Sequence, residues 1–241
     1  MGTARRAFAD HTQGGSFAIT PGFKTLPLYC LFLVTASLTL LAGINTFPAQ
    51  GDSSVPRLTF TKTLKGSLPE YMALSVDANG KGTYDSRKLE DPPNPRPLQI
   101  SAGTTAEMFS LAESLQNFRS LDLDSHQKVA NLGLKTFTYQ AGKEMNQVQF
   151  NYTEMRTARE LTDIFEKISN VEERISDLES AMKYDRLNLP QILSQIQEGL
   201  DDHLFVEVRL MIPTLEKISS DSRFLHLAQS RAREILRQIE R

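Results

Sequence analysis

The sequence contains no tryptophan and a single cysteine, Cys30. One thiol cannot form a disulfide within the chain or a cysteine-based metal site, so the fold must be stabilised by its hydrophobic core. The chain also lacks a clear excess of one charge, because the net charge is −2 and the isoelectric point is about 6.1. Proteins that bind nucleic acid electrostatically carry a basic excess. The composition therefore predicts no nucleic-acid partner.

Recognisable catalytic motifs are missing as well. There is no Gly-x-Ser-x-Gly elbow, no glycine-rich phosphate loop and no His-Glu-x-x-His helix. The four histidines lie far apart in the sequence, at positions 11, 126, 203 and 226. Acidic residues are frequent, but on helices they read as solvated faces. We therefore expect that the chain is not an enzyme and that it uses no cofactor.

One long hydrophobic run is present near the beginning of the sequence. Residues 26–44 contain no charged side chain. As a helix they would span about 28 Å, close to the thickness of the hydrocarbon core of a bilayer. Arg5, Arg6 and Lys24 precede the run, so the positive-inside rule leaves residues 1–25 as a cytoplasmic tail.

This run has two interpretations. The first and favoured one is an uncleaved single-pass anchor in the lipid bilayer, because the run is longer than the usual apolar region of a signal peptide. The second is a signal peptide whose cleavage releases a secreted protein. In both cases the chain after residue 44 faces outward from the cytoplasm.

After a linker at residues 45–57, the pattern is that of an α+β domain over residues 58–184. The pair Asn79-Gly80 predicts a type I′ turn in one hairpin, and Gly142 predicts the turn of another. Alternating apolar and polar residues predict five strands, at 58–64, 70–77, 81–87, 134–139 and 147–152.

A heptad repeat is the most regular pattern in the chain. It predicts a long helix that begins near Thr153 or Thr157 and ends near Tyr184. Its apolar positions follow one another at spacings of three and four residues. We call them the seam, and they are Leu161, Ile164, Ile168, Val171, Ile175, Leu178 and Met182.

Two arrangements could cover the seam. In a parallel homodimer, it would form a coiled coil in which Lys167 and Arg174 face Glu172 and Glu179 of the other copy. A shared membrane would hold two copies parallel and favour this pairing. In the other arrangement, the sheet covers the first turns and the C-terminal helices cover the last. We favour internal coverage, and the homodimer or another protein partner is the alternative.

Residues 185–241 contain only helical patterns. One helix is expected from Asn188, a second over residues 204–218 that is bent or split at Pro213, and a third from Asp221 or Ser222. The predicted fold class is therefore α+β: a small antiparallel sheet of hairpins packed on helices, followed by an all-helical C-terminal cap. The membrane helix would precede this domain at the N-terminus.

The sequence contains one weak candidate for a metal site. Asp122, Asp124 and His126 alternate, so in an extended segment their side chains would point to the same side. Carboxylates and an imidazole are common metal ligands. With only three ligands and no further histidine nearby, we expect that this segment holds no metal.

Part of the chain resembles a family of exported, membrane-anchored bacterial proteins with a domain of unknown function. The resemblance rests on residues 60–84, which contain the Asp-x-x-Gly turn, and on residues 135–139 and 149–153. It covers roughly residues 58–170. It implies a place on the bacterial cytoplasmic membrane with the C-terminal domain in the periplasm, and it transfers no functional residue.

These observations leave two functional hypotheses. The first is a membrane-anchored, extracytoplasmic interaction or structural module with no catalytic site. The second is an envelope ligand-binding module with a pocket between sheet and helices. A filled core with an exposed apolar stripe would favour the first hypothesis, and a pocket with convergent polar groups would favour the second.

Overall fold

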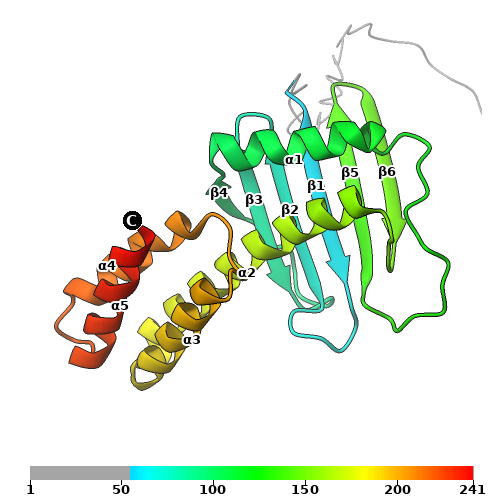
Figure 1. Cartoon of the computed structure of the whole chain (residues 1–241). Helices are drawn as coiled ribbons and strands as arrows, with labels where there is room; N and C mark the ends of the chain where they lie inside the picture. Colours follow the sequence, from blue (N-terminus) through cyan, green and yellow to red (C-terminus); the bar gives the residue numbers. More distant parts are fainter. Residues whose placement is uncertain (1–54, 241) are drawn as a thin grey trace, which may run out of the picture. The chain divides into compact units, whose positions relative to one another are not determined.

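The computed structural model describes residues 55–240 (Figure 1). The predicted cytoplasmic tail, the predicted membrane helix and residues 45–54 of the linker lie outside the described residues. Within residues 55–240, no helix combines the length and the apolar character needed to cross a membrane. The described part of the chain belongs to one compact unit and is α+β, as the sequence predicts.

Six antiparallel strands form one sheet, in the order β4-β3-β2-β1-β5-β6. β1 joins the two hairpins, because Phe60 lies opposite Leu74 of β2 on one side and Phe137 of β5 on the other. The strands are β1 Arg57–Thr63, β2 Tyr71–Asp77, β3 Lys81–Arg87, β4 Arg96–Gln99, β5 Leu134–Ala141 and β6 Glu144–Phe150.

One face of the sheet carries the core. Apolar residues alternate along β1 and β2, so their side chains all point to the same face. Two helices, α1 (Ala102–Ser114) and α2 (Arg156–Tyr184), cross this face (Figure 1). The opposite face is polar, and there the hydroxyl groups of Thr59 and Ser75 form a 2.9 Å hydrogen bond between neighbouring strands.

Aromatic rings fill the centre of this core, as the alternating pattern predicts. Phe137 lies within 5.1 to 6.0 Å, between ring centroids, of four other phenylalanines, which are Phe60, Phe118, Phe150 and Phe165. The register of the second hairpin places Tyr139 opposite Asn146. Tyr139 therefore lies opposite an amide side chain rather than an aromatic ring.

The turn between β2 and β3 differs from the expected type. A type I′ turn needs positive φ at both central residues, whereas Gly80 has φ +77° and Asn79 does not have a positive φ. Oδ1 of Asp77 accepts hydrogen bonds from the backbone N–H groups of Asn79 and Lys81, which stabilises a longer turn. A Cβ at Gly80 would lie 2.4 Å from the carbonyl oxygen of Ile100, so this turn needs glycine.

The seam lies in two successive cores of the same chain. Leu161, Ile164 and Ile168 pack against the sheet and α1. Val171, Ile175 and Leu178 pack against the C-terminal helices, and Met182 is partly buried there. The exposed fractions of the first six side chains are between 0 and 7 %. The chain itself therefore covers the seam, which is the arrangement favoured from the sequence.

The C-terminal helices follow the predicted order with shifted starts. Glu207 is left-handed (φ +65°), so the second helical stretch begins after it rather than at residue 204. Pro213 lies in the first turn of α4, where a proline is tolerated, and does not bend a longer helix. The elements are α3 Leu189–Asp201, the 3₁₀ turn η3 Val208–Met211, α4 Ile212–Ser220 and α5 His226–Ile239.

Candidate functional site

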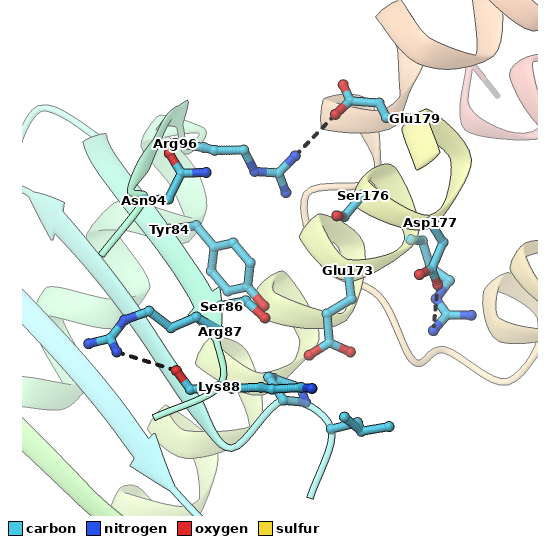
Figure 2. Close-up of a pocket in the computed structure, with 13 residues that line it drawn as sticks. Tyr84, Ser86, Arg87, Lys88, Asn94, Arg96, Glu173, Ser176, Asp177 and Glu179 are labelled. Atoms are coloured by element: carbon cyan, nitrogen blue, oxygen red, sulfur yellow. Dashed lines mark hydrogen bonds and ion pairs between the residues drawn. The ribbon is translucent and has the colours of Figure 1, made fainter. Parts of the chain in front are cut away.

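A pocket of about 610 Å³ lies between β3 and the second half of α2 (Figure 2). Four parts of the chain line it: the β1–β2 turn, β3, the segment that leads into β4, and α2. Most of the lining side chains are polar or charged. They are Leu68, Pro69, Tyr84, Ser86, Arg87, Lys88, Asn94, Arg96, Glu173, Arg174, Ser176, Asp177 and Glu179.

Tyr84 forms the inner wall of the pocket. It lies on the core-facing side of β3, two residues before Ser86, and only 2 % of it is exposed. Its hydroxyl and that of Thr105 are the two buried side-chain groups within residues 55–240 that have no hydrogen-bond partner. Burial and the charge of Glu173 raise the pKa of Tyr84 far above its usual range. The group is therefore a neutral hydroxyl at physiological pH.

Glu173 supplies a carboxylate beside this hydroxyl. In Figure 2 its side chain extends from α2 toward the Tyr84 hydroxyl. Glu173 is half-buried and takes part in none of the ion pairs among residues 55–240, and its carboxylate interacts with the Tyr84 hydroxyl, which favours the charged form. Burial raises the pKa of Glu173, and the positive charge of Arg174 partly opposes that shift. The pocket thus holds a carboxylate whose charge is incompletely compensated.

Arg96 forms the upper wall and connects the sheet edge to α2. Its guanidinium lies 3.1 Å from a carboxylate oxygen of Glu172 and 3.3 Å from one of Glu179, and it also donates to the backbone carbonyl of Glu172. Glu172 is buried, which raises its pKa, while the charge of Arg96 acts in the opposite direction. The positive charge of Arg96 is therefore already compensated by two carboxylates.

Two of the remaining cations are also engaged. Arg174 forms an ion pair of 3.0 Å with Asp177, its neighbour on the same helix. The guanidinium of Arg87 pairs with Asp85 at 3.0 Å and stacks over Tyr71, 4.4 Å from the ring centroid, on the other face of the sheet. Lys88 is exposed and forms no ion pair among residues 55–240.

The weak candidate for a metal site, at Asp122, Asp124 and His126, forms a small polar network. Nε2 of His126 lies 2.8 Å from Oδ2 of Asp122, and the carboxylate of Asp124 accepts hydrogen bonds from the backbone N–H groups of Asn151 and His126. These bonds raise the pKa of His126 and lower the pKa values of both aspartates. Within residues 55–240, no group of three or more histidine, cysteine or acidic side chains is arranged to hold a metal ion.

The charged residues beside the seam have partners within the chain. Lys167 pairs with Asp163 at 3.0 Å, and Arg174 pairs with Asp177 at the same distance. The acids Glu172 and Glu179, which a parallel coiled coil would direct toward a second copy, are both held by Arg96, as described above. A homodimer stays a prediction, and it would have to use a different surface.

Sequence reasoning missed Tyr84, Arg96 and Glu173 as a group. The alternation along the second strand of the first hairpin was a signal for the face on which Tyr84 lies. Arg96 belongs to a proline-rich segment whose composition predicts a loop. Its partners Glu172 and Glu179 follow 76 and 83 positions later in the chain, and nothing local in the sequence connects them to Arg96. Glu173 lies off the seam and reads as an ordinary solvated acid.

No protein-family model matches this chain, and no curated protein matches it in sequence. The resemblance to exported bacterial proteins therefore stays a prediction. Any functional proposal has to rest on the geometry of the pocket and on the sequence.

Proposed function

We propose that this chain is a membrane-anchored, outward-facing binding module of the bacterial envelope, with a small polar ligand bound between β3 and α2. The supporting observation is the hydroxyl of Tyr84, which is buried at the pocket wall without a partner. An unsatisfied buried hydroxyl costs about 1–3 kcal/mol. A ligand that hydrogen-bonds to this group would recover that free energy, which explains why the fold keeps a tyrosine there.

The size and composition of the pocket support the same proposal. About 610 Å³ lies within the range of roughly 300–1,000 Å³ typical of small-molecule sites. The hydroxyl of Ser86 and the carboxylate of Glu173 face the same space as Tyr84 (Figure 2). Leu68 and Pro69 of the β1–β2 turn add apolar surface at the rim. No group in this set needs to act as a catalyst, so the proposal is for binding alone.

The location is proposed from the sequence. The uncharged run at residues 26–44 would anchor the chain in the cytoplasmic membrane, and the cations before it would keep the preceding residues inside. The binding domain would then face the periplasm. Cleavage of the run as a signal peptide is the alternative, and it would release the same domain as a secreted protein.

A protein-interaction module is the second candidate function. The observation that favours it is the turn between α2 and α3, where Tyr184 and Leu187 are 74 % and 77 % exposed. Exposed apolar side chains that lie close together can mark a contact with another protein. Both functions are compatible with a membrane anchor.

A ligand panel tests the proposed pocket. The full-length chain in detergent would be heated with separate polar solutes that are cationic, anionic or neutral. At about 100 times its Kd, a ligand stabilises the folded chain by about 2.7 kcal/mol, or roughly 5–10 °C in Tm. We expect at least one solute class to raise Tm.

The matched variants are Ser176→Trp, which fills the pocket from α2, and Ser180→Trp, an exposed position one turn further along that lies outside it. The first should abolish the shift and the second should retain it. An unchanged Tm with every solute, or a shift that survives Ser176→Trp, would contradict the proposal.

A further inference from the structure

We propose that the ligand of this pocket carries a primary ammonium group, which is received by the carboxylate of Glu173 and the hydroxyl of Tyr84. This inference rests on the proposed binding function and names the chemical class of the ligand. It follows from the balance of charges inside the pocket, from the hydrogen-bonding capacity of the two groups, and from the apolar rim.

The charge balance disfavours an anionic ligand. An anion at Arg96 would lie beside the carboxylates of Glu172 and Glu179, which already compensate its charge, or would have to displace Glu172, a buried carboxylate that lies 3.1 Å from it. Leaving a buried carboxylate without its partner is costly. Arg174 would likewise have to leave Asp177. The carboxylate of Glu173, by contrast, has no ion pair among the described residues, so a cation could bind it without breaking any existing pair.

The hydrogen-bonding capacity favours an ammonium group over a guanidinium. An ammonium group is compact and has three N–H donors and no acceptor. The oxygens of Glu173, Tyr84 and Ser86 could each accept one of these donors, while the hydrogen of the Tyr84 hydroxyl would point to Glu173 or Ser86, because an ammonium group has no acceptor. A guanidinium presents five donors in a planar fork, which is best matched by a second free carboxylate or carbonyl group. Both other acids lining the pocket, Asp177 and Glu179, are already paired.

The rim indicates what the ammonium group is attached to. Leu68 and Pro69 lie at the opening of the pocket, and Leu68 is 88 % exposed. A short alkyl chain would lie against these side chains while its charged end reaches Glu173. Lys88, which also lines the pocket, is exposed and forms no ion pair within residues 55–240. It is the one lining residue that could favour an anion, so the experiment has to include it.

The test compares three probes of similar length: n-butylammonium, butyrate and 1-butanol. Binding to the full-length chain in detergent would be measured by titration of tyrosine fluorescence, which no tryptophan obscures, in a buffer free of amines. We expect butylammonium to bind at least tenfold more tightly than the other two probes. Glu173→Gln and Tyr84→Phe should each weaken that binding about tenfold.

The control is Glu160→Gln, which removes an acid from the same helix outside the pocket and should leave the affinity unchanged. Circular dichroism would establish that each variant is folded. Equal binding of butylammonium by Glu173→Gln would overturn the inference. Preferential binding of butyrate that is lost in Lys88→Gln would also overturn the inference. That result would still support a ligand-binding pocket. If none of the probes and no solute of the larger panel binds, the proposed function fails together with the inference.

Discussion

At the scale of single residues, Tyr84 is the position where the stability of the fold and the proposed ligand binding favour different side chains. Its ring is part of the core, and its hydroxyl faces the pocket without a partner. A side chain retained for stability alone would be phenylalanine at this position. The hydroxyl therefore reads as a functional group whose cost the fold tolerates.

Replacement of Tyr84 by phenylalanine tests this reading. We expect Tyr84→Phe to raise the free energy of unfolding by about 1 kcal/mol, because it removes an unsatisfied buried hydroxyl and keeps the ring. Urea denaturation followed by circular dichroism measures the change. A loss of stability would mean that the hydroxyl already has a strong partner in the folded chain, and that the tyrosine is structural.

Arg96 and Glu172 form the residue pair that connects the edge of the sheet to α2. Arg96→Met should lower the free energy of unfolding by about 2–3 kcal/mol, because it leaves the Glu172 carboxylate buried and unpaired. This expected loss of stability is smaller than the loss for a fully buried ion pair, because the Arg96 side chain is 31 % exposed. Adding Glu172→Met should recover most of the loss. Arg156→Met, in an exposed pair with Glu160, serves as the control and should leave stability nearly unchanged.

The two neighbouring glutamates also predict the pH dependence of stability. Burial raises the pKa values of Glu172 and Glu173 above their ordinary value of 4.5. The folded chain then binds these protons more tightly than the unfolded chain. Their contribution is therefore present below pH 4.5 and is lost as the pH rises through their raised values. The double variant Glu172→Gln, Glu173→Gln should lose less stability than the wild type between pH 4.5 and pH 7, and an equally steep fall would contradict this assignment.

At the scale of secondary-structure elements, α2 is the part of the fold that the sequence described best. Its predicted end at Tyr184 is confirmed, and it begins at Arg156, one residue before Thr157. The heptad spacing could not tell an internal seam from a coiled coil, because both arrangements place apolar residues every 3.5 positions on one face. The difference lies in what packs against that face, and residues far from the helix determine it.

A charge placed in the seam tests the internal arrangement. Ile168 is fully buried, and burying an unpaired carboxylate there would cost more than most domains can tolerate. We expect Ile168→Asp to lose the cooperative unfolding transition in circular dichroism. Ser180→Asp, on the exposed side of the same helix, should retain it. A folded but monomeric Ile168→Asp chain would instead indicate that the seam is an interface between copies.

At the scale of the whole molecule, the proposed anchor at residues 26–44 is the feature with the largest consequence for function. We expect the full-length chain expressed in bacteria to sediment with the membranes and to stay there in sodium carbonate, which removes proteins that are only adsorbed. Protease added from the periplasmic side should digest the folded domain or its linker. Recovery of a soluble chain that begins near residue 45 would instead support cleavage of a signal peptide.

The sequence alone indicated five of the six strands of the described sheet, all except β4, and the residues of α2 that face a core. Alternation and heptad spacing are local consequences of backbone geometry, so they can be recognised without knowing the fold. The tertiary structure decided how distant segments meet. It placed β1 between two hairpins, covered the seam with two different cores, and brought Arg96 to Glu172 and Tyr84 to the pocket that Glu173 lines. Such contacts depend on the total burial of the chain, which no short stretch of sequence records.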